Sequence, residues 1–408
     1  MRVLVINAGS SSLKVSLFEL AQNPAESLQT SRWRGSLDWG HIPGFGEIEV
    51  HTAQGLSLYE KHPYTSLPAG LEQLLSHLWT GSTQVIAGPT AIEAVGHRVV
   101  HGGAQYSQPC WITPEVEADI AALSQFAPIH NPANLAGIIA CRALLGAIPQ
   151  VAVFDTAFHS SLQPAAYTYA LPSRLTEQGI RRYGFHGISH QYCAQRASQL
   201  LNRPLADLRL VICHLGNGCS LSAVGQGVCV DTTMGFTPLE GLVMGTRSGS
   251  VDPGLVLYLL RQGHTVDQVD HLLNRESGLL GLSGIGADMR AILEAKAAGR
   301  PQAELAFDVF IHRLRAGIGA MVANLGGLDA LVFTAGIGEH AAEVRAAACA
   351  TLGFLGLTLD VARNARPAGD SNLAADGSSV AVLVIHTQED WAIAQACWQM
   401  LTPGVSQP

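Results

Sequence analysis

The chain has 408 residues, of which 48% are hydrophobic and only 14% charged, and its formal net charge is -8. At roughly 150 residues per domain this length predicts two or three domains, and the apolar fraction is ample for a packed core in each. The 32 acidic residues outnumber the 24 basic ones, which argues against a nucleic-acid partner, because phosphate contacts need a basic face.

Neither a membrane span nor a secretory signal is predicted. A span needs about 20 consecutive apolar residues, whereas the best candidate, residues 135–148, is shorter and contains Arg142. The apolar run 3–6 is too short for a signal-peptide core, so we expect a cytoplasmic protein. The eight cysteines include no CxxC pair, and neither a zinc site nor a disulfide framework is predicted.

Short β-branched runs alternate with longer helical patterns, which is typical of an α/β protein with buried strands. In the first part of the chain we expect strands at 3–6, 13–20, 47–51, 92–100 and 151–154, the first two forming a hairpin. Helices are expected at 66–79, 114–126 and from 131 to about 145. Asn131 suits the N-cap of the third helix and Pro132 its first turn.

After Asp155, where a domain boundary is expected, the plan restarts. The strand 210–213 is followed by a turn, Gly216-Asn217-Gly218, like the turn that follows the first strand. A third strand and Gly turn at 331–339 leads into a helix to about 352, after a long helix at 303–325. A strand at 380–385 and a helix at 388–401 close the chain. The repetition predicts an internal duplication, with two lobes around a cleft.

The turn after the first strand has the composition of an anion-binding loop. Residues 7–14, NAGSSSLK, supply an amide, three hydroxyls and one of only three lysines. Glycine lets the backbone approach a ligand, and successive N–H groups can surround an anion. We therefore predict phosphate binding here. Neither GxxxxGK[ST] nor a GxGxxG after a strand is present, so no P-loop or dinucleotide fold is implied.

Arg98 and Arg247 both lie among glycines, in GHRVVHGG and GTRSGS. An arginine so placed can bind a carboxylate or phosphate through two parallel hydrogen bonds. An arginine taken singly is more often part of a surface ion pair. Because the chain is poor in charge, the repeated design favours anion binding.

Asp155 and Glu389 lie where strands pass into loops or helices, as oxygen ligands of Mg²⁺ commonly do. Glu389 could instead be an acidic residue that the helix dipole favours in the first turn of a helix, and from the local sequence alone this is the better interpretation. His186 and His190 are four residues apart but lack the HExxH pattern, so a metalloprotease site is not predicted.

At this point the sequence resembles a known family. The stretches VLVINAGSSSLK, GHRVVHGG, APIHNP, VAVFDTAFH, RRYGFHGISH, HLGNGCSL, DTTMGFTPLEGLVMGTRSGSVDP, FTAGIGE and TQED occur in that order between residues 3 and 390. They are similar to the acetokinase family, which contains acetate, propionate and butyrate kinases. The resemblance implies the duplicated two-domain α/β fold of actin, Hsp70 and sugar kinases (ribonuclease H-like). The implied domains are 1–155 with 391–408, and 156–390.

The family's reaction is the reversible transfer of the ATP γ-phosphoryl group to acetate, giving acetyl phosphate and ADP, with Mg²⁺ or, alternatively, Mn²⁺. The resemblance therefore implies acetate and ATP as substrates, and a homodimer. Propionate kinase is the alternative within the family. A nucleotide-gated conformational switch, like the actin and Hsp70 relatives, is the alternative from another class.

The resemblance also assigns roles to residues. It implies that the catalytic residues are Arg98, Asp155, His186 and Arg247, and that Asn7 and Glu389 are linked to the metal. The acetate pocket is implied to contain Arg98, Val100, Ile129, Phe185 and Pro238. The nucleotide residues are implied to be Ser12, Lys14, His214, Leu215, Gly216, Asn217, Gly218, Asp288, Met289, Arg290, Gly336, Ile337, Gly338 and His340. His340, Gln388 and Asp390 depart from the family's usual Asn, Asn and Glu.

Overall fold

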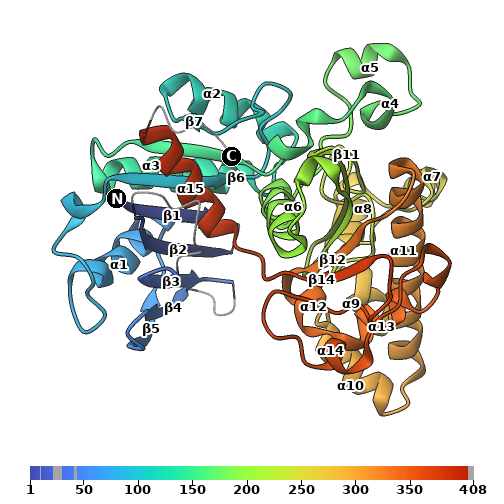
Figure 1. The fold of residues 1–408 in the computed structure, drawn as a ribbon. Coiled ribbons are helices and arrows are strands. Elements are labelled where there is room, and N and C mark those ends of the chain that lie inside the picture. Colours follow the sequence, from blue (N-terminus) through green and yellow to red (C-terminus); the bar gives the residue numbers. More distant parts are fainter. Residues whose placement is uncertain (10, 22–29, 41–43, 403–408) are drawn as a thin grey trace. The chain divides into compact units, whose positions relative to one another are not determined.

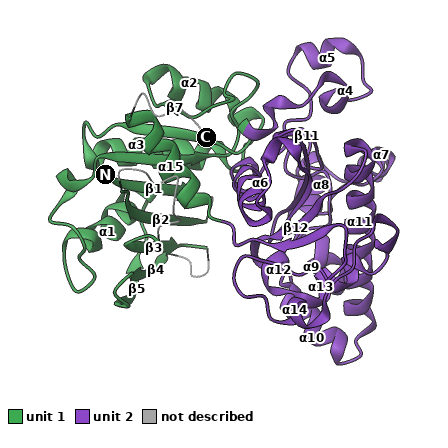
Figure 2. Ribbon diagram, in the orientation of Figure 1, with its two compact units in different colours: residues 1–157, 388–408 green, residues 158–387 purple. Residues whose placement is uncertain are grey.

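The structure is a computed structural model that describes residues 1–9, 11–21, 30–40 and 44–402. The chain divides into two compact units, residues 1–157 with 388–408, and residues 158–387 (Figure 2). Predicted domain ends at 155 and 390 place residues 388–390 in the second unit, and the structure corrects this. Glu389 begins helix α15 (Glu389–Leu401), which packs on the first unit's sheet.

Unit 1 is an eight-stranded mixed sheet in the order β5-β4-β3-β2-β1-β6-β8-β7 (Figure 1). Its strands are β1 (Arg2–Ala8), β2 (Ser12–Glu19), β3 (Trp33–Asp38), β4 (Phe45–Thr52), β5 (Ser57–Pro63), β6 (Ala94–Val99), β7 (Cys110–Trp111) and β8 (Gln150–Phe154). The helices besides α15 are α1 (Leu67–Trp79), α2 (Pro114–Ala122) and α3 (Asn131–Leu145), with short 3-10 turns η2 (Pro89–Ala91), η3 (Leu123–Gln125) and η4 (Ala157–Ser161), the last crossing into unit 2.

Both faces of this sheet are covered, which explains why β1 is an uninterrupted apolar run. Leu4 and Ile6 belong to the core cluster that includes residues of α1 and α3. The opposite face packs against α15, where Phe18 meets Trp391 with ring centroids 5.7 Å apart. Side chains alternate between the faces of a strand, so Asn7 points to the same face as Val3 and Val5, the face that α15 covers.

Unit 2 repeats the central topology. Its sheet has the order β11-β10-β9-β12-β14-β13, and β9, β12 and β14 run parallel as β1, β6 and β8 do. The strands are β9 (Arg209–Leu215), β10 (Cys219–Gly225), β11 (Val228–Thr232), β12 (Ala330–Thr334), β13 (Ser371–Asn372) and β14 (Ala381–Val384). The duplicated α/β fold predicted from the sequence is confirmed.

The helices of unit 2 are more numerous than predicted. They are α4 (Pro164–Tyr167), α5 (Ser173–Glu177), α6 (Gly187–Leu201), α7 (Pro253–Arg261), α8 (Val266–Arg275), α9 (Gly278–Ser283), α10 (Met289–Ala297), α11 (Pro301–Leu325), α12 (Ala335–His340), α13 (Ala342–Cys349) and α14 (Val361–Ala365), with 3-10 turns η5 (Leu205–Asp207) and η6 (Gly353–Leu355). The predicted single helix up to 352 is two helices, α12 and α13, separated at Ala341.

Two local predictions were wrong. Strands β3, β5, β7, β11 and β13 were missed. Asn131 was expected to cap α3, but it is the first residue of the helix, and His130 is at the cap without a side-chain capping hydrogen bond. The buried Asn131 amide instead accepts from His101 N at 3.0 Å and donates to His101 O at 3.1 Å. No helix among the described residues is long and apolar enough to cross a membrane, and all eight cysteines are free.

Candidate active site

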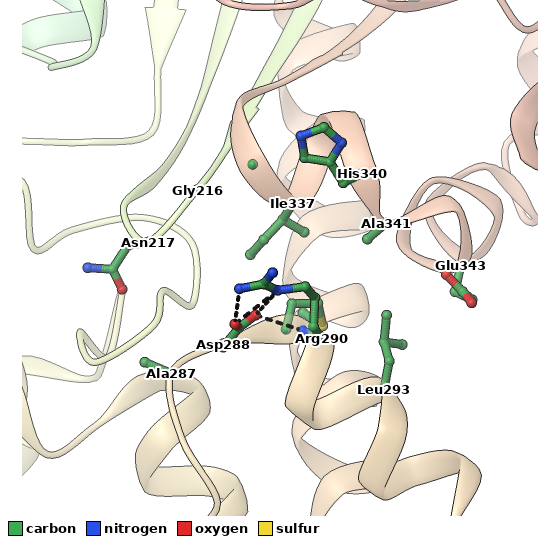
Figure 3. A pocket seen from close by; sticks show the side chains of 12 residues that line it. Gly216, Asn217, Ala287, Asp288, Arg290, Leu293, Ile337, His340, Ala341 and Glu343 are labelled. Atoms are coloured by element: carbon green, nitrogen blue, oxygen red, sulfur yellow. Dashed lines mark hydrogen bonds and ion pairs between the residues drawn. The ribbon is translucent and has the colours of Figure 1, made fainter. Parts of the chain in front are cut away.

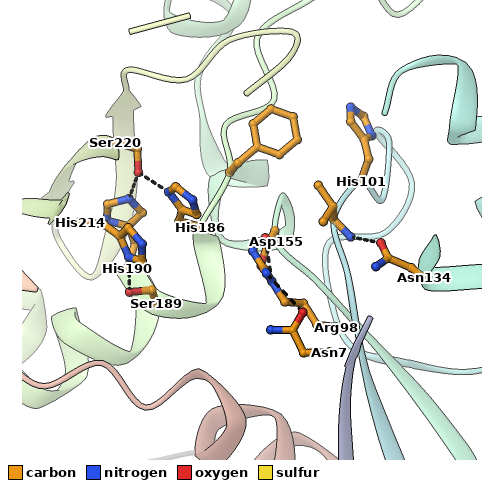
Figure 4. A network of polar contacts seen from close by, with 12 residues as sticks. Asn7, Arg98, His101, Asn134, Asp155, His186, Ser189, His190, His214 and Ser220 are labelled. Atoms are coloured by element: carbon orange, nitrogen blue, oxygen red, sulfur yellow. Dashed lines mark hydrogen bonds and ion pairs between the residues drawn. The ribbon is translucent and has the colours of Figure 1, made fainter. Parts of the chain in front are cut away.

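Three predicted residues of unit 1 meet at the carboxyl ends of parallel strands (Figure 4). Asn7 is near the end of β1, Arg98 near the end of β6, and Asp155 directly follows β8. The Arg98 Nε donates to both Asp155 carboxylate oxygens at 3.1 Å, and Nη1 donates to Asn7 Oδ1 at 3.4 Å. Ligands of open α/β sheets bind beyond the carboxyl ends of the strands, so this is the expected place for a site.

The first turn of α15 adds two carboxylates, those of Glu389 and Asp390, to the surroundings of Arg98. Burial by itself lowers the pKa of Arg98, but Asp155, Glu389 and Asp390 outweigh burial and raise it above its ordinary value. Asp155 is 1% exposed and the Arg98 side chain 20%, so the arginine keeps a solvent-facing part. Asp390 itself accepts a 2.6 Å hydrogen bond from Ser16 Oγ on β2, which fixes the start of α15 beside the sheet.

Two asparagines of α3, Asn131 and Asn134, hold the loop after β6, a role that was not predicted from the sequence. Asn134 accepts from Val100 N at 3.0 Å and donates to Ala8 O at 2.7 Å. It therefore ties the predicted pocket residue Val100 to the end of β1. Buried polar groups need partners, and an Asn at the inward face of an apolar helix is the sequence signal that could have found it.

The remaining predicted residues of unit 1 are spread more widely. Ser12 and Lys14 lie on β2, and Lys14 pairs with Asn7 in the sheet register. The Lys14 side chain is exposed, Val100 is buried and Ile129 is half-buried. These three side chains are not joined by hydrogen bonds.

In unit 2, His186 and Arg247 converge on the Gly216-Asn217-Gly218 turn between β9 and β10. A Cβ atom built on Gly218 would lie 2.8 Å from Arg247 Nη2 and 3.2 Å from His186 Nε2. The two nitrogens therefore face one small space, which the glycine leaves open. An anionic oxygen lying between the two nitrogens, at van der Waals distance from the glycine backbone, could accept a hydrogen bond from both.

Local backbone and hydrogen bonds hold both side chains in this position. His186 has a left-handed backbone, with φ 58°, directly before α6; such non-glycine conformations cost energy and are concentrated at functional sites. Arg247 Nη1 donates to Pro238 O at 2.6 Å. Burial lowers the pKa of Arg247 but leaves it a cation, since its ordinary value is far above neutrality.

A cavity of about 880 Å³ opens beside the same turn, within unit 2 (Figure 3). Its lining is a mixture of small, apolar and polar side chains: Gly216, Asn217, Ala287, Asp288, Met289, Arg290, Leu293, Gly336, Ile337, His340, Ala341 and Glu343. The volume is in the range of small-molecule and cofactor sites. The close-up shows Arg290 held by Asp288, with Nη2 2.7 Å from Oδ2.

Eight predicted nucleotide residues therefore line one cavity: Gly216, Asn217, Asp288, Met289, Arg290, Gly336, Ile337 and His340. His214, Leu215, Gly218 and Gly338 do not line it; Gly218 lies at the His186–Arg247 space. The lining residues that were missed are Ala287, Leu293, Ala341 and Glu343. Leu293 lies one helical turn after Met289, and this spacing was the available signal.

The turn at the start of α12, which contributes Gly336 and Ile337 to the cavity, is stabilised by a buried carboxylate. Glu339 is buried, and its carboxylate accepts from Ala335 N at 2.9 Å and from Thr387 N at 3.1 Å. Ala335 has a φ of 63°, so the carboxylate holds a strained turn at the start of α12. Burial alone raises the pKa of Glu339, but the bonds from His386, Thr387 and Ala335 outweigh it and lower the pKa.

Two α/β units of one topology, a cavity of nucleotide size and an arginine near a strand end form the arrangement expected of a phosphotransferase of the actin and sugar-kinase class. The comparisons with known proteins specify the family. The acetokinase family model matches residues 2–395. Acetate kinases of Cyanothece sp. and Gloeobacter violaceus are 56% and 57% identical, each over 98% of this chain and over 98% and 100% of their own lengths.

Solved structures give the same result. The Porphyromonas gingivalis acetate kinase has a TM-score of 0.91 and 37% identity, covering 98% of this chain and 100% of its own. The Francisella tularensis propionate kinase has a TM-score of 0.88 and 36% identity, covering 97% and 98%. The chain belongs to the acetokinase family, and the predicted family and enzyme class, a kinase, are confirmed.

Proposed function

We propose that the protein is an acetate kinase that transfers the γ-phosphoryl group of ATP directly to acetate, giving acetyl phosphate and ADP. Family membership supports the acid and the donor. The observation within the structure that carries the proposal is the pair of donors, His186 Nε2 and Arg247 Nη2, facing the space over Gly218. This arrangement suits an anionic group in transfer, because charge builds on its equatorial oxygens.

The acceptor needs no general base. A carboxylate is already ionised at neutral pH, since carboxyl pKa values lie near 4. The residues are then left with orientation and charge stabilisation. We assign Arg98 to the acetate carboxylate, with Asp155 fixing the guanidinium through two hydrogen bonds at 3.1 Å. We assign Val100, Ile129, Phe185 and Pro238 to the apolar wall around the acetate methyl.

We assign ATP to the 880 Å³ cavity of unit 2. Its apolar members, Met289, Leu293 and Ile337, suit the faces of a base, and the Gly216 and Gly336 turns let the backbone approach phosphates. Ser12 and Lys14 remain proposed phosphate contacts. Neither assignment extends to the preference between ATP and other nucleotides, because His340 replaces the family's usual asparagine.

Magnesium fits the oxygen donors at the end of the unit 1 sheet. Asn7 Oδ1 and the carboxylates of Asp155 and Glu389 are hard ligands, the kind that Mg²⁺ prefers. No group of three or more His, Cys, Asp or Glu side chains that could hold a metal occurs among the described residues. Enzymes that act on nucleotides commonly bind Mg²⁺ through one or two carboxylates together with substrate phosphates. When bound, the ion would neutralise charge on the phosphates.

We propose a homodimer, formed through helix α7. No residue of this helix is buried in the chain, although its sequence PGLVLYLLR is strongly apolar. Leu255, Leu257 and Tyr258 are 44%, 52% and 56% exposed, and clustered exposed apolar residues mark interaction sites. Tyr258→Glu should convert the dimer to a monomer in light scattering, whereas Val361→Glu, at an 83% exposed position, should leave it dimeric. A cytoplasmic location and the absence of nucleic-acid partners complete the proposal.

A coupled assay for ADP, run with and without acetate, separates this proposal from the conformational-switch alternative. An acetate kinase releases ADP only when acetate is present. A switch hydrolyses ATP at the same rate in either case. Propionate kinase is tested by the same assay: one methylene is worth about 1 to 3 kcal/mol in an apolar pocket, so propionate should react less well. A kcat/KM for propionate that equals or exceeds that for acetate would favour the alternative.

A further inference from the structure

A buried serine joins two histidine rings behind the His186–Arg247 space (Figure 4). Ser220 lies on β10 and is fully buried. Its hydroxyl oxygen is 2.9 Å from His186 Nδ1 and 2.7 Å from His190 Nε2. A hydroxyl has one hydrogen to donate and lone pairs to accept, so it can donate to only one of these rings.

The inner ring, His190, is neutral. It is fully buried, and its surroundings include the rings of His159 and His214, with centroids 5.7 Å and 6.1 Å away. Burial, and then the two neighbouring histidines, place the pKa of His190 well below its ordinary value. A neutral imidazole carries one N–H and one lone pair, and the question is which nitrogen has the proton.

The unpartnered nitrogen decides this. His190 Nδ1 is buried without a hydrogen-bond partner. A proton on Nδ1 would leave a buried N–H donor unpaired, and orphaned buried N–H groups are rarer than orphaned acceptors. The proton is therefore placed on Nε2, which donates to the Ser220 oxygen. Ser220 in turn donates its single hydrogen to His186 Nδ1.

We infer that Ser220, with His190 behind it, fixes His186 as the tautomer that carries its proton on Nε2. That nitrogen is the one beside Gly218 and Arg247 Nη2. The relay therefore presents an N–H donor, and not a lone pair, to an anion in this space. His190 and Ser220 are positioning residues, which act through His186.

Stacking supports the same orientation. The rings of His186 and His214 are stacked, with centroids 4.1 Å apart and an interplanar angle of 18°. His214 is held from its own side by Ser189 Oγ, 2.8 Å from Nδ1. His186 is thus restrained by its strained backbone, by a stacked ring and by Ser220. A 180° rotation of the ring would put Cδ2 in the place of Nδ1 and break the bond to Ser220.

The role of Ser220 and His190 in phosphoryl transfer rests on the proposed function, but the tautomer of His186 does not. A measurement of ring protonation in the unliganded protein therefore tests the tautomer separately from the activity. In unliganded protein labelled with ¹⁵N-histidine, protonated and unprotonated ring nitrogens resonate far apart at neutral pH. His186→Gln and His190→Gln identify the two sets of signals. We expect both rings to carry the proton on Nε2. A proton on Nδ1 of His186 would overturn the inference, whether or not the protein makes acetyl phosphate.

Kinetics of paired variants test the role. Ser220→Ala should lower kcat by about tenfold, the value of about one hydrogen bond, with KM for ATP and acetate within twofold of wild type. Ser222→Ala is the matched control, because Ser222 is on the same face of the same strand, fully buried, with a hydroxyl that has no partner. Ser220→Thr, which restores the hydroxyl, should recover most activity. Equal losses in Ser220→Ala and Ser222→Ala would indicate packing alone and overturn the role.

Discussion

Substituting Gly218 by alanine would fill the space to which we assign the transferring phosphoryl group. The added Cβ would lie 2.8 Å from Arg247 Nη2, 3.2 Å from His186 Nε2 and 3.2 Å from His186 Cε1. With the methyl group present, an oxygen bound by both donors could no longer approach this part of the backbone. The Arg247 end is flexible and can swing away, so the fold should survive, but the arginine then leaves its position.

The loss of one preorganised donor to a developing anion costs on the order of 10²- to 10³-fold in kcat. We therefore expect Gly218→Ala to lower kcat at least about 100-fold in an ADP-coupled assay. Its thermal midpoint should stay within about 2 °C of wild type, because the close contact is with the end of a flexible side chain and is relieved when Arg247 moves. Gly319→Ala, at a glycine with nothing within 4 Å, is the control. A fully folded Gly218→Ala with kcat within threefold of wild type would refute the placement.

Three further perturbations test other parts of the account. Arg98→Ala should destabilise the protein by about 3 kcal/mol in urea unfolding, because it leaves the 1% exposed Asp155 carboxylate without its cation. Arg98→Lys, which keeps a cation, should lose less stability. Equal stability of the wild type and both variants would contradict the ion pair. Burial lowers the pKa of His97 to about 4 in the folded protein, whereas in the unfolded chain it is about 6.5. Between these pH values the unfolded chain therefore binds a proton at His97 that the folded protein does not bind. Stability should therefore drop by about 2 kcal/mol between pH 7 and pH 5 on this account alone, and His97→Gln should show a correspondingly shallower pH dependence; an identical slope would count against it. His340→Asn should change KM for ATP while KM for acetate stays within twofold, since His340 lines only the nucleotide cavity, and a change in acetate KM alone would be inconsistent with that assignment.

The sheet cores were predictable because their signal is local. The apolar run at residues 3–6 is continuous since helices cover both faces of β1, and the repeated strand and glycine turn revealed the duplication. Strand β3 was missed because Trp33–Asp38 contains Arg34, Gly35 and Ser36, which weaken any apolar alternation. Asn131 matched the pattern of a cap, yet its side chain binds the His101 backbone, a partner 30 residues away.

Candidate site residues could be named from the sequence where they lie at strand ends, as Arg98 and Asp155 do, or among glycines, as Arg247 does. The site was not predictable where function depends on distant neighbours. Glu343 enters the cavity only because α12 and α13 break at Ala341. The Ser220 relay joins a strand to the start of α6 across 34 residues, and no spacing in the sequence indicates which histidine nitrogen faces the serine.

The central claim, phosphoryl transfer to acetate, is tested most directly by trapping the product. Purified protein is incubated with ATP, Mg²⁺ and hydroxylamine, together with acetate, propionate or butyrate, and the acyl hydroxamate is measured beside the ADP released. We predict one hydroxamate for each ADP, with acetate giving the highest kcat/KM. ADP release that is independent of acetate and yields no hydroxamate would contradict the account.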